Sequence, residues 1–489
     1  NDNKTIWLGE GLGGGTLHFG MQYIDQSNVY QELPEIRLYL DKVNNLTKVE
    51  GFDYSKKSSG LWNEIYNKFK DDDEIIFNNN KIYSNDLSNN KRFIASDLLN
   101  NLNIDIKTNA NVTNIVIEDN IAKEIKLENN KTIKFNQLIM CGGSIENVKI
   151  INKSNILKNL PIGKTVFDHG AINLYYMPKN EEFSNYISIG HLQIRSKDLK
   201  WQIYLNKVPN VPYLVVTIAQ GKKESNEGQV LFNDKYDILL NHFNDFDKPE
   251  TLLSAYDYIN KKLNELNYVN LETKNIDEEY IKNSYDSIYH YHGTCPFDKV
   301  VDRSNKVIGI DNMYISDISV LTKSVPGSTS VASMVLGYRF ARIFNDKNVL
   351  DIENQIISLE NENVKLEQDK KDLYSVSRLK ELWTKESKMY VVIQNDGQTV
   401  GSGEKRVYDM GYYWRGGGHP VNLAPYLDEN SLWFTNYDFT NLLKNRHGTF
   451  SAWRIIRGGA KEVGLFDDGL LDIKISDNLE KIKNLLKNI

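Results

Sequence analysis

Apolar and polar residues alternate most clearly between positions 103 and 140. This stretch reads NIDIKTNANVTNIVIEDNIAKEIKLENNKTIKFNQLIM, and Asn-rich turns interrupt its period of two. A period of two places the apolar side chains on one face of a strand. The pattern therefore predicts a short antiparallel ribbon that returns to a buried strand at Gln137–Met140.

Other periods divide the rest of the chain. Residues 58–70 have apolar positions at helical spacing, and residues 171–290 mix strand-like segments with the helical run ETLLSAYDYINKKLNEL. This mixture predicts a sheet with helices on one side. After position 345, apolar residues follow a heptad in a highly charged background, which predicts a helical connector or short coiled coil. An aromatic-rich segment from Tyr390 predicts a separate small domain.

Length and composition narrow the classes of protein. A chain of 489 residues is too long for one core, so several domains are expected. Its 59 basic and 65 acidic residues give a net charge of -6, which calls for neither nucleic acid nor a membrane surface as partner. No apolar run is long enough to predict a transmembrane helix. The two cysteines, Cys141 and Cys295, predict reduced thiols rather than a disulfide framework.

The candidate chemistry is concentrated in one region. The segment SIYHYHGTCPFDKVV contains His290 and His292 beside a Gly-Thr turn, and the following segment has a strand that ends at Asp317 and a helix that starts near Ser330. This order predicts an imidazole, an acidic strand end and a helix N-terminus in one pocket. Such a pocket suits an anionic cofactor with a general base beside it. A metal pair is the weaker interpretation, because no further ligand lies at the required spacing.

Two Gly-rich turns support a cofactor site. The N-terminal loop GEGLGGGTLHFG satisfies G-x-G-x-x-G at Gly9, Gly11 and Gly14, although only TIWL precedes it where the fingerprint needs a strand. Glycines let the backbone lie directly along a cofactor. The second turn, LIMCGGSIEN, is a strand that passes through Gly142 into a helix. The alternatives are a Gly-rich surface loop and an ordinary strand-to-helix turn.

Taken together, these segments resemble the glucose-methanol-choline (GMC) family of FAD-dependent alcohol oxidoreductases over about residues 5–346. The resemblance is most specific at 287–346. It implies an α/β FAD-binding fold with an interleaved sheet-plus-helix substrate domain and a small C-terminal α+β domain. The expected parts are an FAD-binding domain at 1–170, a substrate domain at 171–289, a return to the FAD domain at 290–348, a helical connector at 349–385 and a small domain at 386–489.

The resemblance also implies which residues hold FAD. His18 stands where some family members attach FAD covalently, with a non-covalent packing histidine as the alternative. The backbone of Val112 would face the adenine ring. The implied FAD-binding positions are Gly11, Gly13, Gly14, Gly15, Thr16, His18, Phe19, Gly20, Val112, Gly142, Asp317, Ile318, Ser328 and Thr329.

For catalysis, the resemblance implies that His290 accepts the substrate's hydroxyl proton while a hydride moves to the flavin. An imidazole, with an ordinary pKa of about 6.5, suits that role. His292 is the neighbouring candidate in the turn. The family's second catalytic residue, a His or Asn, corresponds to Ser328 here, and a serine reaches less far. Asp168 and His169 match a family stretch and are interpreted as capping and packing groups.

Two parts of the chain depart from the family pattern. The family's N-terminal strand, loop and helix, about 30 residues long, do not precede Gly9. Either the chain is a fragment, a partner chain supplies the unit, or FAD binding has been lost. The C-terminal segment weakly resembles cytochrome b5-like domains, which would make His419 and His447 the axial ligands of a haem iron. A haemless or unrelated interaction module is the default interpretation.

We therefore expect an FAD-dependent oxidoreductase that acts on a small-molecule alcohol with His290 as base. The alternative is a catalytically weak or inactive GMC-like structural protein, such as a component of a giant-virus particle. Homo-oligomerisation is a further possibility, and two heptads are too few to decide it. The N-terminus resembles neither a signal nor a transit peptide, which favours a cytoplasmic or virion-associated location.

Overall fold

The chain forms two compact units, Asn1–Leu350 and Asp351–Ile489. A computed structural model describes a large part of the first unit and selected elements of the second. The described residues are 11–17, 22–23, 30–47, 50–51, 60–77, 81–82, 84–86, 91–92, 94–99, 102–179, 191–207, 213–221, 228–232, 238–241, 249–327, 329–373, 389–392, 405–408, 411–414, 432–435, 449–456 and 459–489.

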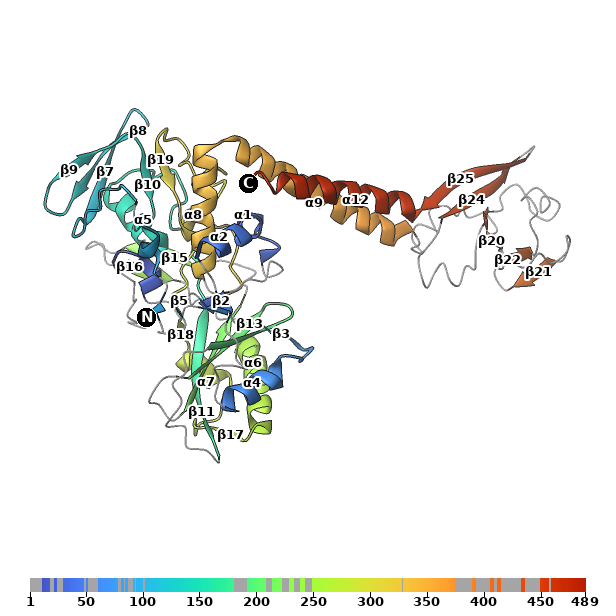
Figure 1. Ribbon diagram of the computed structural model, residues 1–489, viewed down its shortest axis with the longest axis horizontal. Helices are drawn as coiled ribbons and strands as arrows, with labels where there is room; N and C mark the ends of the chain where they lie inside the picture. The colour runs from blue at the N-terminus through green and yellow to red at the C-terminus, as the bar shows by residue number, and fades with distance from the viewer. Residues whose placement is uncertain are drawn as a thin grey trace. The chain divides into compact units, whose positions relative to one another are not determined.

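Two parallel strands from distant parts of the sequence form the centre of the first unit's upper part (Figure 1). Strand β10 (Leu138–Met140) pairs in parallel with β19 (Met313–Ile315), with Met140 opposite Ile315. Helix α5 (Gly143–Lys153) follows the first strand, and the short 3-10 helix η6 (Ile318–Val320) follows the second. The carboxyl ends of both strands and the starts of both helical turns therefore lie at one edge.

The predicted ribbon is confirmed. It comprises β7 (Val112–Glu118), β8 (Ile121–Leu127) and β9 (Thr132–Lys134), which pair antiparallel before the chain enters β10. Asn312 joins the ribbon to the parallel pair: its Oδ1 accepts from the Ala122 backbone N–H at 2.8 Å, and its Nδ2 donates to the Ala122 carbonyl at 2.9 Å. A buried amide that bonds a strand twice in this way substitutes for a ladder pair.

The lower part of the first unit is an antiparallel sheet with helices on one face, as the sequence predicts (Figure 1). The sheet order is β17-β11-β14-β13-β12-β3, and β18 pairs with β11. The strands are β3 (Ile75–Phe77), β11 (Gly170–Pro178), β12 (His191–Ser196), β13 (Trp201–Lys207), β14 (Leu214–Gln220), β17 (Tyr268–Asn270) and β18 (Asp286–Ser287).

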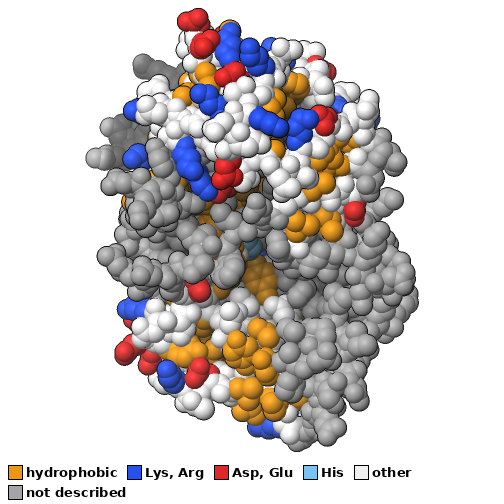
Figure 2. Space-filling model, turned by 90° about the vertical axis from the view of Figure 1, so that its left-hand side faces the viewer, with side chains coloured by type: hydrophobic (Ala, Val, Ile, Leu, Met, Phe, Trp, Pro, Cys, Tyr) orange, Lys and Arg blue, Asp and Glu red, His pale blue; other side chains and the backbone are white. Residues whose placement is uncertain are grey.

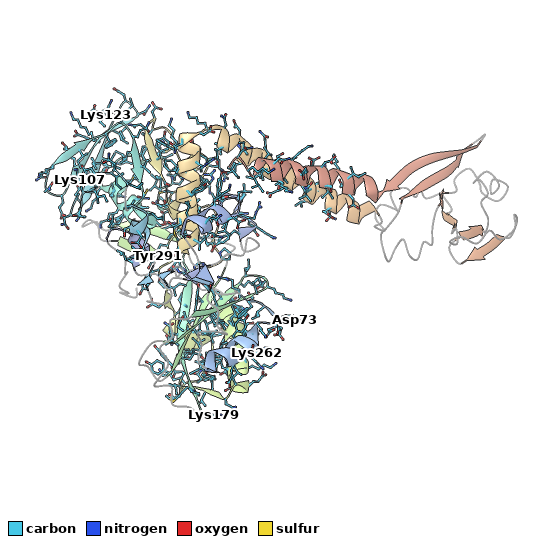
Figure 3. The ribbon with its side chains drawn as sticks, in the orientation of Figure 1. Asp73, Lys107, Lys123, Lys179, Lys262 and Tyr291 are labelled. Atoms are coloured by element: carbon cyan, nitrogen blue, oxygen red, sulfur yellow. The ribbon has the colours of Figure 1, made fainter. Side chains whose placement is uncertain are left out.

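Helices α4 (Gly60–Phe69) and α6 (Pro249–Glu265) pack their apolar stripes on that sheet, and α7 (Glu278–Ser284) lies beside them. Alternate strand residues such as Ile194 and Ile203 enter the same core, because successive side chains of a strand point to opposite faces. Lys262 of α6 (labelled in Figure 3) forms an ion pair with a residue just after α4, Asp72, which the figure does not label. Strand β3 pairs with β12, so the sheet also takes a strand from the segment 1–170.

Helix α8 (Thr329–Asn345) covers the upper part and begins within one residue of the predicted start near Ser330. Helices α1 (Pro34–Arg37) and α2 (Leu40–Thr47) pack against it, with the rings of Tyr39 and Tyr338 6.2 Å apart. The remaining short elements of the first unit are η1 (Gly14–Leu17), β1 (Gln22–Tyr23), β2 (Glu50–Gly51), β4 (Lys81–Ile82), β5 (Ser84–Asp86), β6 (Lys91–Arg92), η4 (Ala95–Leu99), β15 (Gln229–Phe232) and β16 (Ile238–Asn241).

In the second unit, helix α12 (Asp468–Leu485) contacts α9 (Asn348–Leu373), which contains the predicted heptad positions. Asn478 Nδ2 donates to Asn363 Oδ1 at 2.9 Å and to Glu362 Oε2 at 3.1 Å. Four strands form a sheet in the order β20-β23-β24-β25, and β21 pairs with β22. These strands are β20 (Met389–Val392), β21 (Lys405–Tyr408), β22 (Gly411–Trp414), β23 (Leu432–Thr435), β24 (Thr449–Ile456) and β25 (Gly459–Asp467).

The expected connector at 349–385 and the expected small domain at 386–489 thus fall almost wholly in the second unit. His419 and His447, the predicted haem ligands, lie outside the described residues. Among the helices that the structure describes, none combines the length and apolar character needed to cross a lipid bilayer.

Candidate active site

The acidic end of β19 fixes the edge at which the two parallel strands end. Asp317 Oδ2 accepts hydrogen bonds from the Gly143 backbone N–H at 2.9 Å and from Asn147 Nδ2 at 2.7 Å. Its Oδ1 accepts from the Ser319 backbone N–H at 2.9 Å. One buried carboxylate therefore joins the start of α5 to the start of η6. These contacts make Asp317 the link between the two turns of the site.

The turn from β10 into α5 leaves its backbone open. Gly143 has φ +76°, a conformation that L side chains rarely adopt, and a Cβ at this position would meet no atom within 4 Å. The hydroxyl of Ser144, next in the chain, is buried and has no hydrogen-bond partner among the residues that the structure describes. A bare backbone, an orphaned hydroxyl and a helix N-terminus together form a surface that suits a polar or anionic ligand group.

The N-terminal Gly-rich loop is also open. Gly11 and Gly13 have φ +137° and +110°, and the Gly14 N–H donates to the Gly11 carbonyl at 3.0 Å before η1 begins. Added Cβ atoms at Gly14 and Gly15 would meet nothing within 4 Å. Thr16 lies within η1. The other candidates in this loop, His18, Phe19 and Gly20, lie outside the described residues.

His290 belongs to a chain of hydrogen bonds that determines its tautomer. His169 Nε2 lies 2.7 Å from the Val325 carbonyl oxygen, and His169 Nδ1 lies 2.9 Å from His290 Nδ1. A carbonyl can only accept, so His169 carries its proton on Nε2 and its Nδ1 accepts. His290 must then donate from Nδ1, which leaves its Nε2 with a lone pair. None of the hydrogen bonds formed among the described residues uses that nitrogen.

Burial keeps His290 uncharged. It lowers the pKa of His290 to about 4, while the Asp168 carboxylate opposes this shift. The ring is half-buried, whereas His169 and His292 are fully buried. Figure 2 shows histidine atoms in the hollow between the upper and lower parts of the first unit. A neutral imidazole whose second ring nitrogen is not hydrogen-bonded can accept a proton from a bound hydroxyl group.

His292 has a different environment. Its Nδ1 lies 2.6 Å from the His290 carbonyl, and its Nε2 accepts from the Val325 backbone N–H at 3.0 Å. Both ring nitrogens are thus bonded to backbone groups, and the ring stacks on Phe167 at 5.2 Å. His292 therefore fixes its own loop to Val325. Because both of its ring nitrogens are bonded, the candidate base is His290.

Asp168 holds the loop that carries His290. Its Oδ1 accepts from the His290 backbone N–H at 2.9 Å, and its Oδ2 accepts from the Ser287 hydroxyl at 2.5 Å. Ser287 in turn bonds to the hydroxyl of Tyr291, at the level between the two parts of the unit (Figure 3). The interpretation of Asp168 as a capping group agrees with these contacts.

Backbone contacts bring the histidine loop to the two strand ends. Thr294 Oγ1 donates to the Ser144 carbonyl at 2.8 Å, and the Gly293 N–H donates to the Ile318 carbonyl at 3.3 Å. The site therefore unites the 290–295 loop, the start of α5 and the Asp317 turn. Cys295 in this loop is buried and unpaired with another cysteine, and burial raises the pKa of its thiol to about 12.

Three other predicted positions are placed less directly. Thr329 begins α8, and Ser328 just before it lies outside the described residues. Val112 begins β7, whose residue Asn114 bonds to the Lys153 carbonyl at the opposite end of α5 from Gly143. Gly142 precedes α5, and its N–H donates to a side-chain oxygen of the same helix.

Sequence reasoning missed that His169 touches His290 and that Val325 supports both His169 and His292. The sequence signal for these contacts is the Asp-His pair at 168–169, because Asp168 caps the loop that carries His290 and His169 bonds to the His290 ring. Among the described residues, no group of three or more His, Cys, Asp or Glu is arranged to hold a metal ion.

Comparisons with known proteins agree with this arrangement. The family model described as GMC oxidoreductase matches residues 242–337, which include the histidine loop, the Asp317 turn and half of α8. A GMC-type oxidoreductase of Acanthamoeba polyphaga mimivirus is 30% identical over 122 residues, which are 21% of this chain and 22% of that protein. A truncated GMC-type oxidoreductase of the same virus, named as inactive, is 43% identical over 49 residues, which are 10% of this chain and 60% of that protein.

The fold extends the likeness beyond these segments. An FAD-containing formate oxidase from Aspergillus oryzae superimposes with a TM-score of 0.58 at 12% identity, covering 70% of this chain and 85% of that one. The architecture is therefore the FAD-binding fold of flavoprotein oxidases, an α/β class, as the sequence predicts. Residues 242–337 match the GMC oxidoreductase family, and short segments of the chain resemble GMC-type oxidoreductases of mimivirus. The matched segments span less than two thirds of the curated relatives' length. Neither the cytochrome b5-like resemblance nor haem receives support.

Proposed function

We propose that this protein is an FAD-dependent oxidoreductase that oxidises an alcohol, with His290 as the general base. The observation that carries the proposal is the hydrogen-bond chain from the Val325 carbonyl through His169 to His290. This chain supports an uncharged His290 whose Nε2 lone pair is available for a hydroxyl proton. FAD, when bound, would supply the acceptor for the hydride that leaves the alcohol carbon.

The residues present fit a nucleotide-type cofactor at the strand ends. Gly143 and Ser144 offer an open backbone and an unpartnered hydroxyl at the start of α5, and Gly14 and Gly15 offer a second bare backbone surface. We propose that these residues hold FAD. Asp317 would act through them, because its carboxylate fixes the Gly143 N–H and the Asn147 amide.

Each side chain has a separate task in the proposed reaction. His290 accepts the hydroxyl proton at Nε2, which raises electron density on the alcohol oxygen and assists departure of the hydride from carbon. His169 keeps the Nδ1 proton of His290 in place. His292 and Asp168 fix the loop backbone on either side of the base.

The test is reduction of bound flavin by alcohols in the absence of oxygen. The full chain, loaded with FAD, should show flavin absorbance that an alcohol bleaches. The variant His290→Gln should retain the absorbance and lose bleaching rate by about 100-fold or more. Lys299→Gln, an exposed change in the same region, is the matched control and should bleach at the wild-type rate. Equal rates in wild type and His290→Gln would rule out His290 as the base.

A second candidate is a catalytically inactive, structural GMC-like protein of a virus particle. Two observations favour it: Ser328 occupies the family's second catalytic position, and a mimivirus relative is named as inactive. In this case flavin is either not retained or is not reduced by any alcohol in the wild type. Restoring a histidine through Ser328→His should then create bleaching activity if only that side chain is lacking.

A further inference from the structure

The sheet in the lower part of the first unit has a second face that is polar as well as buried. On β12 and β13, Ile194 and Ile203 enter the helix-covered core, and the alternate residues point to the opposite side. Those alternate residues are almost fully buried even though they are polar. They are Gln193, Arg195, Gln202 and Tyr204, with exposed fractions of 1%, 1%, 0% and 8%.

Arg195 is the charged member of this face, and within the described part of the chain it has no counter-ion. Its Nε donates to the Pro326 carbonyl at 3.2 Å, but neither of its terminal nitrogens, NH1 and NH2, has a hydrogen-bond partner. None of the ion pairs among the described residues includes it. Burying an unpaired guanidinium lowers the stability of the folded chain. Its presence here therefore points to a ligand that pairs with the charge.

The neighbouring hydroxyls do not neutralise that charge. Tyr30 and Tyr204 lie close enough to interact electrostatically with Arg195, but burial raises the pKa of both phenols, which therefore stay uncharged. Tyr204 donates its proton to Gln202 Oε1 at 2.7 Å. The Tyr30 hydroxyl is also buried, and it has no hydrogen-bond partner among the described residues, so its donor is unused beside the guanidinium.

Arg195 and the histidines of the candidate site bond to adjacent backbone residues. Pro326, whose carbonyl it binds, directly follows Val325, which bonds to both His169 and His292. Consecutive Cα atoms are only about 3.8 Å apart, so the guanidinium and the histidine pair are anchored to the same short stretch of backbone. A small molecule bound at Arg195 would be held beside the site of proton transfer.

We propose that the NH1–NH2 edge of Arg195, assisted by the Tyr30 hydroxyl, binds a carboxylate, and that the substrate is therefore a hydroxy acid. Two parallel N–H donors on one planar edge match the two oxygens of a carboxylate. The single positive charge balances a single negative charge. The binding claim stands on Arg195 and Tyr30 alone, whereas the substrate class rests on the proposed alcohol oxidation.

The binding test compares acetate with acetamide, which has the same shape and no charge. Calorimetric titration of the full chain should show acetate binding at least tenfold tighter than acetamide. Arg195→Gln should reduce acetate affinity by about tenfold to a hundredfold and leave acetamide unchanged. Equal affinity of the wild type for the two probes would overturn the proposal, and so would acetate affinity that survives in Arg195→Gln.

A stability measurement separates a binding role from a structural one. If Arg195 is kept for a ligand, Arg195→Met removes an unpaired buried charge, so the ligand-free chain should melt at a higher temperature than wild type and no longer respond to acetate. A lower melting temperature would mean that the guanidinium holds the fold, and the proposal would fail. Tyr30→Phe should weaken acetate binding by a smaller factor without loss of folding.

The substrate class has its own test. Glycolate and ethylene glycol are both primary alcohols, and only glycolate has a carboxylate. Flavin bleaching should favour glycolate in wild type and lose that preference in Arg195→Gln. If acetate binds but neither alcohol bleaches the flavin, alcohol oxidation fails and the carboxylate site stands. If both alcohols bleach it equally, the reaction stands and the hydroxy-acid assignment fails.

Discussion

Acidification should destabilise the wild-type chain more than its His290→Gln variant. Burial lowers the pKa of His290 to about 4 in the folded chain, whereas an unfolded histidine titrates near 6.5. Between these values the unfolded chain binds a proton that the folded chain does not bind. Unfolding is therefore favoured as the pH falls through this range, and above about pH 6.5 the contribution disappears because both states are neutral.

The size of the effect follows from the two pKa values. The gap between 6.5 and about 4 corresponds to about 3 kcal/mol of unfolding free energy once the pH is below both values. Between pH 7 and pH 5 the expected loss is about 1–2 kcal/mol, since part of the ring remains exposed to water. A glutamine side chain binds no proton in this pH range, so the variant does not undergo this loss of unfolding free energy.

Urea unfolding at pH 7 and pH 5 measures the difference. The free energy of unfolding of the wild type relative to His290→Gln should fall by about 1–2 kcal/mol on going to pH 5. Lys299→Gln serves as the control, because it changes an exposed side chain near the same loop and leaves His290 in place. If the wild-type and His290→Gln free energies remain parallel, His290 is not kept neutral by the fold, and the base assignment loses its main support.

Three further predictions concern the framework of the site. His169→Phe removes the hydrogen-bond acceptor of His290 and should lower the rate of flavin bleaching by about 10–100-fold. His169→Gln retains a donor and an acceptor, so in the same assay it should bleach flavin much faster than His169→Phe. Asp317→Ala removes the carboxylate that three N–H donors share and should cost about 3 kcal/mol in urea unfolding, whereas Asp311→Ala at an exposed ion pair should cost under about 1 kcal/mol; equal losses would contradict the bridging role. Gly170→Ala places a Cβ 1.5 Å from a buried tyrosine ring and should prevent folding. Gly337→Ala, at an uncrowded position in the middle of α8, should instead raise the melting temperature. A soluble, stable Gly170→Ala protein would show that the tyrosine ring can move away.

Local periodicity predicts the local elements of this fold. The period of two at 103–140 corresponds to the ribbon and β10, the helical spacing at 58–70 corresponds to α4, and the heptad after 345 lies within α9. Each of these elements buries apolar residues at regular spacing against one neighbouring surface. The spacing alone therefore contains the information that specifies them.

Contacts between distant segments are not visible in that pattern. Nothing near Ile75–Phe77 indicates that β3 extends a sheet whose next strand, β12, begins at His191. His169 and His290 are 121 positions apart, and the strands beside them, β11 and β18, pair with Gly170 opposite Ser287. Arg195 has the alternating position of a strand residue, but only the fold shows that its terminal nitrogens are buried without partners.

The pairing of Asp317 with Gly143 has a consequence for biosynthesis. The two residues are 174 positions apart, so the α5 turn leaves the ribosome long before the carboxylate that fixes it. At about 5–20 residues per second, the nascent chain waits roughly ten to thirty-five seconds with that turn unanchored. A nucleotide cofactor that depends on the completed edge would therefore be captured only after the last third of the first unit has been synthesised.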